Sequence, residues 1–305
     1  MATAVGLAVV LHVVVHQRLF PGWGADIDQC LIGARALWHG ANPYAVIGPH
    51  GTWFRWPWPL YYPLTALFAV TPLAWMPLAV ARPIFIGGSS AWLAFMVSRR
   101  SWAPLLLFLS GAFLNTVDSG TWDALLVAAA ITPGMGWLLL AKPNVGAALA
   151  MMLERRRATA VAAGIGVGFV ALTVAIMPGW LTDWRAALAT GVHFVPPLLL
   201  PLGFLVLPVL VKWRRPEARL LVALACVPQT LYPHAALALF LVPRGRAEMT
   251  ALAILSFVPL ALAYYTAPTT GTMAEQTRLI GVAMVACLYL PCVIMVLRRP
   301  AVAVA

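Results

Sequence analysis

The chain has 305 residues, of which 62% are hydrophobic and 10% are charged, and its formal net charge is +11. Soluble domains carry roughly 25% charged residues, so this composition excludes an ordinary soluble domain. Apolar runs recur along the whole chain, which excludes a soluble domain with a single anchor, and runs such as AVGLAVVLHVVV lack the alternation of a β-barrel strand. The sequence therefore predicts an all-α, polytopic integral membrane protein with one transmembrane domain over residues 1–305.

The N-terminal part is predicted to hold one short span, residues 2–16, and a long outer loop, residues 18–60. Neither a basic stretch nor a small-x-small cleavage site accompanies the first run, so we expect a retained helix rather than a cleaved signal peptide. The loop contains the stretch WFRWPWPLYYP, whose Trp and Tyr residues are typical of the headgroup level. Helical spacing within the loop predicts a short amphipathic helix at the membrane surface, with apolar positions Ile27, Leu31, Ala34, Leu37 and Trp38 and an end near Gly40, Asn42 and Pro43.

The rest of the chain is predicted to contain further spans, which gives about ten to twelve in total. Many apolar runs are shorter than the ~20 residues of a perpendicular helix, which favours a bundle around a cavity where neighbouring protein satisfies broken backbone. Residues 103–133 form either two spans or a re-entrant, broken hairpin. The runs are 62–80, 84–98, 103–114, 121–133, 136–153, 158–177, 198–211, 219–231, 235–243, 250–266 and 278–297.

The positive charge gathers in short clusters at the ends of apolar runs, as in Arg155-Arg156-Arg157, Lys212-Arg214-Arg215 and Arg298-Arg299. This position is typical of cytoplasmic helix ends and of contacts with anionic lipid headgroups, so nucleic acid is not an expected partner. Arg99-Arg100 is the exception, because a full span count places it on the outer side. The four cysteines show no paired spacing, and we expect neither a disulfide framework nor a zinc site from them.

Asp26 and Asp28 draw attention because the chain holds only nine acidic residues. Both precede or begin the predicted surface helix, beside an aromatic loop at the mouth of any outward-facing cavity. A carboxylate at that position can accept the proton of an attacking hydroxyl, a contribution of roughly 10²–10⁴-fold. The alternative is that Asp26 simply caps the N-terminus of the helix, which aspartate does well.

Lys142 is the second candidate, because it lies in WLLLAKPNVGAAL, an otherwise uncharged run. A lysine near the middle of a membrane costs roughly 2.5–3.5 kcal/mol and usually faces a cavity and a partner. Pro143 follows directly, so we expect a kink that frees backbone carbonyls. The alternative is that Lys142 marks a helix end and extends its amine to the interface.

His234 is the third candidate, in VPQTLYPHAALALF, where Pro228 and Pro233 interrupt the run. It can donate a hydrogen bond to an anionic oxygen, or it can cap an interfacial turn. His12 and His16 share one face of the first helix, but no two histidines show metal-ligand spacing with a carboxylate, so we expect no metal site.

An ordered set of short motifs resembles the polyprenyl-phosphate-mannose-dependent mannosyltransferases of glycosyltransferase family 87, which have the GT-C fold. Asp26 is followed fourteen residues later by Gly40 of the G-x-N-P-Y element GANPY, as in the first outer loop of that family. The similarity continues, in the family's order, through Tyr62-Pro63-Leu64, the Pro72-Leu73 pair, Lys142-Pro143 after Gly136, and Tyr232-Pro233-His234.

The resemblance implies an inverting, single-displacement transferase at the outer, periplasmic face of a bacterial plasma membrane. It would move mannose from a polyprenyl-phosphate donor to a lipid-linked or cell-envelope glycan, with no metal or cofactor beyond that donor. Asp26 would be the base. His234, Lys142, Arg55, Arg185 and Tyr62 would bind the donor phosphate or substrate, and Asp28, Asn42 and Tyr44 would have secondary roles.

The sequence departs from the family pattern at two residues, Leu64 and Thr121. Leu64 stands where a second proline usually follows tyrosine-proline, and Thr121 follows Gly120 where glutamine is frequent. The chain is also short for the family. Two alternatives therefore stay open: a flippase or transporter of lipid-linked saccharides, which also uses broken helices and intramembrane charges, and a family member without activity.

Overall fold

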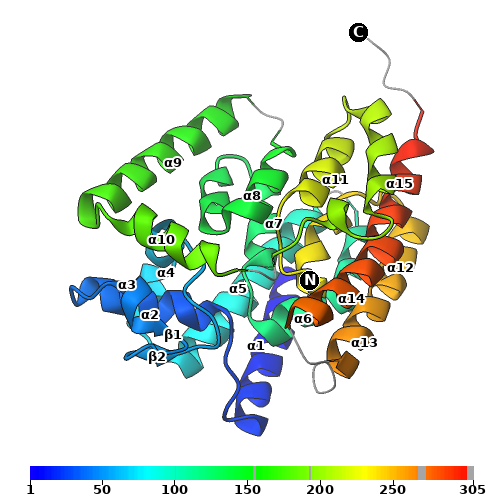
Figure 1. The fold of residues 1–305 in the computed structure, drawn as a ribbon. Helices are drawn as coiled ribbons and strands as arrows, with labels where there is room; N and C mark the ends of the chain where they lie inside the picture. The colour runs from blue at the N-terminus through cyan, green and yellow to red at the C-terminus, as the bar shows by residue number, and fades with distance from the viewer. Residues whose placement is uncertain (100, 154–155, 192–193, 267–272, 301–305) are drawn as a thin grey trace.

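A computed structural model describes residues 1–99, 101–153, 156–191, 194–266 and 273–300. These residues confirm the all-α fold class (Figure 1). The α-helices are α1 (Ala2–Leu19), α2 (Ile27–Trp38), α3 (Pro43–Val46), α4 (Leu64–Ala74), α5 (Leu78–Ser98), α6 (Gly111–Ser119), α7 (Asp123–Ile131), α8 (Pro143–Ala150), α9 (Arg156–Ile176), α10 (Trp180–Ala189), α11 (Pro216–Cys226), α12 (Arg246–Leu255), α13 (Phe257–Thr266), α14 (Met273–Met284) and α15 (Leu290–Leu297).

Shorter and tighter elements connect these helices. Two strands, β1 (Ile47–Gly48) and β2 (Phe54–Arg55), pair in parallel within the aromatic loop. The 3₁₀ segments are η1 (Ala103–Leu109), η2 (Gly136–Ala141), η3 (Pro197–Leu199), η4 (Gly203–Lys212) and η5 (Pro233–Leu241), and the π-helical turn is η6 (Val285–Tyr289).

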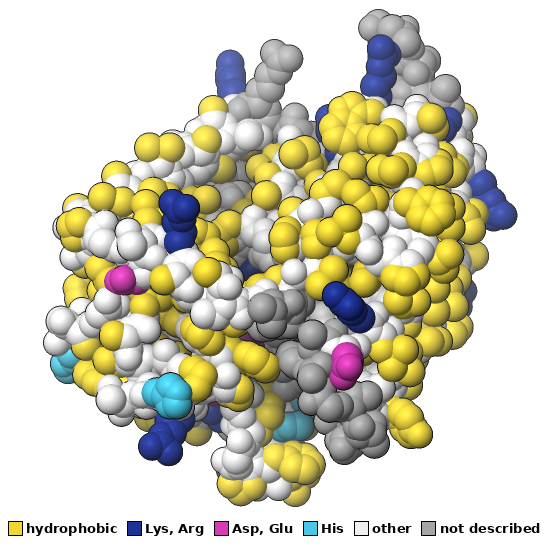
Figure 2. All heavy atoms as spheres, viewed as in Figure 1, with side chains coloured by type: hydrophobic (Ala, Val, Ile, Leu, Met, Phe, Trp, Pro, Cys, Tyr) yellow, Lys and Arg dark blue, Asp and Glu magenta, His cyan; other side chains and the backbone are white. Residues whose placement is uncertain are grey.

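Five helical stretches in the described part of the chain are long and apolar enough to cross a membrane. They are Ala2–Leu19, Leu78–Ser98, Arg157–Ile176, Arg246–Thr266 and Glu275–Leu297. Large apolar side chains remain exposed on several of them, for example Leu11 at 65% and Val167 at 71%. Hydrophobic side chains cover much of the face seen in Figure 2, with charges scattered among them. This surface suits a hydrocarbon surrounding, where apolar exposure carries no cost.

Several runs predicted as single spans are shorter or divided elements. The run 103–114 becomes η1 and the start of α6, and the run 136–153 becomes η2 and α8 with a break at Lys142. Pro143 causes that break, because proline lacks the N–H that would continue the ladder and its ring excludes the preceding turn. Such divided helices leave polar backbone in the interior, around the cavity described below.

The helix predicted in the outer loop is present as α2, and it ends close to Gly40 as expected. The prediction that this helix lies at the membrane surface does not match its packing. The α2 helix packs against α4 and α5, and most of its residues are buried. Asp28 is fully buried, and Arg35 donates to the backbone carbonyls of Ala74 and Met76 at the end of α4. Polar side chains of α2 therefore find protein partners instead of water.

The scaffold beneath the site is a close pair, α1 against α5 (Figure 1). At Gly87 an added Cβ would come within 2.4 Å of Val10 Cγ2, so only glycine permits this approach. Small residues at such crossings are typical of helices that pack within a membrane. The α5 helix in turn carries Arg82 toward the start of α2.

Candidate functional site

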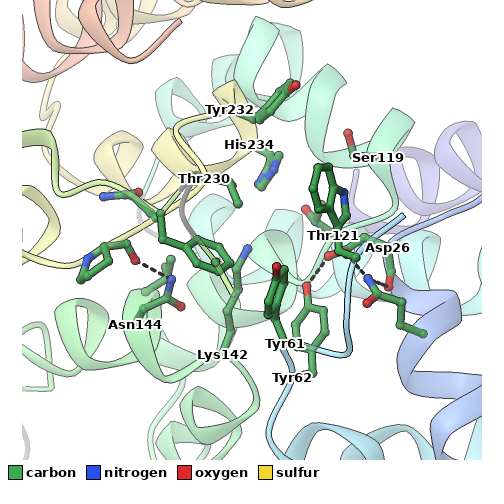
Figure 3. Close-up of a pocket in the computed structure, with 18 of the residues that line it drawn as sticks. Asp26, Tyr61, Tyr62, Ser119, Thr121, Lys142, Asn144, Thr230, Tyr232 and His234 are labelled. Atoms are coloured by element: carbon green, nitrogen blue, oxygen red, sulfur yellow. Dashed lines mark hydrogen bonds between the residues drawn. The ribbon is translucent and has the colours of Figure 1, made fainter. Parts of the chain in front are cut away.

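A cavity of about 730 Å³ lies where the first turn of α2, the aromatic loop, the α6–α7 connection, the η2–α8 junction, α10 and the start of η5 meet (Figure 3). Asp26, Lys142 and His234, which lie far apart in the sequence, all line it. Aromatic side chains form much of the remaining wall: Trp56, Trp58, Tyr61, Tyr62, Trp184, Phe194 and Tyr232. A mostly apolar cavity with a few convergent polar groups is the usual form of a small-molecule site.

Backbone hydrogen bonds to the end of α6 fix the position of Asp26. The Asp26 N–H donates to the Ser119 carbonyl at 2.8 Å, and the Ile27 N–H donates to the Gly120 carbonyl at 3.1 Å. Gly120 has φ +60°, and a Cβ there would approach Ala25 Cβ to 2.5 Å, so the contact requires glycine. The start of α2 is thereby held at the cavity wall.

The Asp26 side chain is not used as a helix cap, although Asp26 occupies the N-cap position of α2. Its Oδ1 accepts a hydrogen bond from Gln29 Nε2 at 2.7 Å, and its Oδ2 accepts one from the Tyr62 hydroxyl (Figure 3). Burial raises the pKa of Asp26 above its usual value, against the opposing effects of the Lys142 charge and the Tyr62 hydrogen bond. A raised pKa makes the carboxylate a stronger proton acceptor.

Asp28 performs the local structural role instead. Its Oδ2 accepts from the Ala25 N–H at 2.9 Å, and its two oxygens accept from Arg82 Nε and Nη2 at 2.8 and 2.7 Å. The Arg82 guanidinium also lies over the Trp23 ring, 5.1 Å from its centroid. Asp28 is absent from the cavity lining. Of the two neighbouring aspartates, Asp26 therefore lines the cavity and Asp28 belongs to a buried ion pair.

A second polar cluster faces the same cavity around Asp123. The Oδ2 atom of Asp123 lies 3.3 Å from Lys142 Nζ and 3.0 Å from His234 Nδ1. The backbone N–H of His234 donates to Asn115 Oδ1 at 3.0 Å, which holds the start of η5 against α6. Because Nδ1 faces Asp123, the Nε2 atom of His234 is the ring nitrogen left for a group in the cavity.

The break between η2 and α8 places Lys142 at this cluster. Lys142 has φ −140° and ψ 79°, so the chain leaves the helical region at this residue and restarts at Pro143. Asn144, in the first turn of α8, donates to the Pro228 carbonyl at 2.9 Å and so ties this junction to the loop before His234. Lys142 thus does lie at a helix end, as the last cap of η2 and the first cap of α8, and its amine is mostly buried and paired with Asp123.

Other predicted residues lie behind or outside the cavity. Tyr44 donates its hydroxyl to the Tyr62 backbone carbonyl at 3.1 Å. Asn42 caps α3 through the Tyr44 N–H and donates to Asp183 Oδ2 at 2.8 Å. These contacts support the loop that carries Tyr62.

Arg55, on β2, and Arg185, on α10, are both exposed, and neither lines the cavity. The structure thus does not bring a predicted arginine beside Lys142 and His234. The cations that the described residues supply there are Lys142 and, when protonated, His234.

Two residues of these clusters, Asp123 and Arg82, were not predicted as functional or structural partners. A usable signal was present for both, because each is a charged side chain inside or at the start of an apolar run, where a partner of opposite sign is required. Lys142 therefore called for a carboxylate and Asp28 for a cation. The sequence alone does not say which of the available charges meets which.

Comparisons with protein-family models, with curated proteins and with solved structures found no match.

A group of metal-ligating side chains does occur near the cavity, formed by His12, His16 and Asp118. Sequence spacing gave no carboxylate near these histidines, because Asp118 comes from α6, about a hundred residues away in the chain. The structure thus places a carboxylate beside these two histidines that their spacing in the sequence does not indicate.

Proposed function

We propose that the protein is a membrane glycosyltransferase that moves a sugar, with mannose the expected one, from a polyprenyl-phosphate donor to a lipid-linked or cell-envelope glycan. The observation that carries the proposal is the presence of Asp26, Lys142 and His234 on one cavity. The Asp26 side chain does not cap α2, and its pKa is raised. Lys142 and His234 line the same aromatic-walled cavity.

In the proposed reaction Asp26 accepts the proton of the acceptor hydroxyl as the hydroxyl oxygen forms a bond to the anomeric carbon of the donor. The bond between that carbon and the phosphate oxygen breaks, and the electron pair leaves with the polyprenyl phosphate. Attack opposite the leaving group inverts the configuration at the anomeric carbon. Removal of the proton by a positioned carboxylate contributes roughly 10²–10⁴-fold.

The leaving phosphate gains negative charge, which donors already in place can stabilise without reorganisation. Lys142 offers N–H groups beyond the one facing Asp123, and His234 offers Nε2. Asp123 orients both side chains through one oxygen atom. The negative charge of Asp123 also offsets part of the positive charge of Lys142 and His234. The site is therefore expected to bind the phosphate of the intact donor less strongly than the more negative phosphate that leaves.

The rest of the proposal follows the motif resemblance. The fold would be a GT-C-like bundle in which the short and divided helices complete about ten to twelve spans. The cavity would open to the outer side of a bacterial plasma membrane, where the aromatic loop meets the headgroups. Tyr62 would position the Asp26 carboxylate through its hydroxyl.

The decisive experiment is transfer by membranes that contain the Asp26→Asn variant. Release of polyprenyl phosphate from synthetic polyprenyl-phosphate-mannose is measured with membranes that also hold the natural acceptors. We expect loss of at least ~100-fold in rate at normal protein level, because Asn has the shape of Asp and cannot take a proton. Glu248→Gln changes a partly exposed carboxylate that does not line the cavity, and as the matched control it should keep the full rate. Equal rates for Asp26→Asn and wild type would remove Asp26 as the base.

A transporter of lipid-linked saccharides is the second candidate, favoured by the helix break at Lys142 beside a cavity. It predicts that vesicles containing the protein move a labelled lipid-linked sugar between leaflets without breaking its phosphate bond. Measurement of both leaflet exposure and phosphate release separates the two functions. If correctly folded protein shows neither sugar transfer nor lipid translocation, the result would favour a family member without activity.

A further inference from the structure

A cluster of three potential metal ligands lies between α1 and α6. His12 Nε2 is 2.9 Å from Asp118 Oδ1, and the ligand atoms of His12, His16 and Asp118 all lie within 4.8 Å of one another. His12 and His16 are four residues apart on α1, so both imidazoles project from one face of the helix. The carboxylate arrives from α6, which packs against that face.

Surrounding residues hold the three side chains in position. The second oxygen of Asp118 accepts a hydrogen bond from the Tyr264 hydroxyl at 2.7 Å, and the Trp23 indole N–H donates to the Asp118 carbonyl at 2.8 Å. The His16 ring packs against the rings of Trp23 and Phe20, with centroids 4.9 and 4.8 Å away. Carboxylates that bind metals usually accept hydrogen bonds of this kind, which orient them toward the ion.

A hydrogen bond between His12 and Asp118 explains two of the three residues without any metal. It does not explain His16, whose imidazole faces the same point from the next helical turn. Ligand atoms on one tetrahedral Zn²⁺ lie roughly 3.3 Å apart, given bonds of ~2.0–2.1 Å. The observed separations run from 2.9 Å to at most 4.8 Å, so metal binding requires His16 and its two neighbours to adjust their spacing.

We infer that His12, His16 and Asp118 form a binding site for one divalent transition metal ion, Zn²⁺ by the chemistry of its ligands. Two imidazoles and a carboxylate suit Zn²⁺, whereas Mg²⁺ and Ca²⁺ take sets of oxygen ligands. Three protein ligands leave a fourth position for water or an anionic oxygen. Asp118 also lines the cavity, so the ion would be bound next to the cavity wall. The inference holds whether or not the protein transfers sugars.

The test uses the full chain, purified in detergent with a tag that contains no histidine and stripped of metal by chelation. Zn²⁺ binding is measured by calorimetry, and Co²⁺ is added separately because its visible spectrum reports tetrahedral coordination. We expect one ion per chain, and more than ~10-fold weaker binding for His16→Ala and for Asp118→Asn. His50→Ala removes an exposed imidazole outside the cluster and is the control that should bind like wild type.

Tyr264→Phe provides an independent readout, because it keeps all three ligands and removes only the hydrogen bond to Asp118. Loss of a hydrogen bond that orients a metal ligand weakens metal affinity by ~10–100-fold. If His16→Ala does not yield monodisperse protein, Tyr264→Phe decides the question. Absence of a stoichiometric ion in wild type, or unchanged affinity in both His16→Ala and Tyr264→Phe, would show a simple His12–Asp118 hydrogen bond and overturn the inference.

Discussion

Asp26 and Asp28 lie two residues apart at the start of α2, yet they face different regions of the molecule. The side that faces α5 is closed: Asp28 is fully buried and its oxygens meet Arg82 and the Ala25 N–H. The side that faces the cavity is open: Asp26 meets neutral donors, Tyr62 and Gln29, and no cation among the described residues bonds to it directly. The same side-chain type thus has a charged partner in one region and neutral partners in the other.

This difference shows how a chain with few charges can separate folding from chemistry. The Asp28 carboxylate is held by two hydrogen bonds from a guanidinium, whereas the Asp26 carboxylate accepts from a phenol and an amide, and burial raises its pKa above the usual value. The fold uses Arg82 to satisfy Asp28 and keeps Lys142 away from Asp26 by pairing it with Asp123. Changes that remove a partner should therefore damage folding on the closed side and chemistry on the open side.

The largest effect is expected for Asp28→Asn. Removal of one partner of a buried ion pair costs about 3–5 kcal/mol, because it leaves an uncompensated buried charge on Arg82. We expect the melting temperature in detergent to fall by more than about 6 °C, with loss of folded protein in membranes. Asp26→Asn is the matched control, and its melting temperature should stay close to wild type. A stable Asp28→Asn would mean that water or lipid reaches Arg82.

A double change sharpens the same comparison. Asp28→Leu combined with Arg82→Met replaces the ion pair by apolar groups, and such replacements are often neutral in stability. We expect the double variant to melt above either single variant. A melting temperature below both would show that Asp28 and Arg82 stabilise other groups separately.

The next effect, on the open side, is expected for Lys142→Met. Loss of one donor that stabilises developing charge lowers the rate constant by about 10²–10³-fold in comparable sites. Asp123 loses one of its two partners in this variant, so the melting temperature should also fall, but less than in Asp28→Asn, because His234 still contacts Asp123. Arg185→Ala removes an exposed cation outside the cavity and is the control. A large loss of activity in Arg185→Ala with little loss in Lys142→Met would mean that Arg185, and not Lys142, stabilises the leaving phosphate.

Much of this arrangement could be predicted from sequence, and for identifiable reasons. The apolar composition gave the all-α membrane class, and helical spacing gave α2 with its end near Gly40. The rarity of charge in apolar runs singled out Lys142 and Asp26. What the sequence could not give was pairing, because each cation has several possible carboxylates and their choice depends on tertiary packing. The Asp123–His234 and Asp28–Arg82 contacts join residues on separate elements.

The smallest effect is expected for Tyr62→Phe, which removes one hydrogen bond from Asp26 and leaves the cavity wall intact. That hydrogen bond favours the ionised carboxylate, so its loss raises the pKa of Asp26 further above the usual range. A base must be ionised to act, and activity is therefore lost as pH falls through its pKa. The acid limb of the rate profile should move to higher pH in Tyr62→Phe, while the plateau rate at higher pH stays within ~10-fold of wild type.

Tyr61→Phe is the matched control for this shift, because the Tyr61 hydroxyl contacts Thr190 rather than Asp26. An acid limb that stays in place in Tyr62→Phe, with the whole profile lowered evenly, would mean that Tyr62 acts by packing. A shift toward lower pH would contradict Asp26 as the titrating base. The direction of this one shift thus distinguishes the open carboxylate from its neighbours across the cavity.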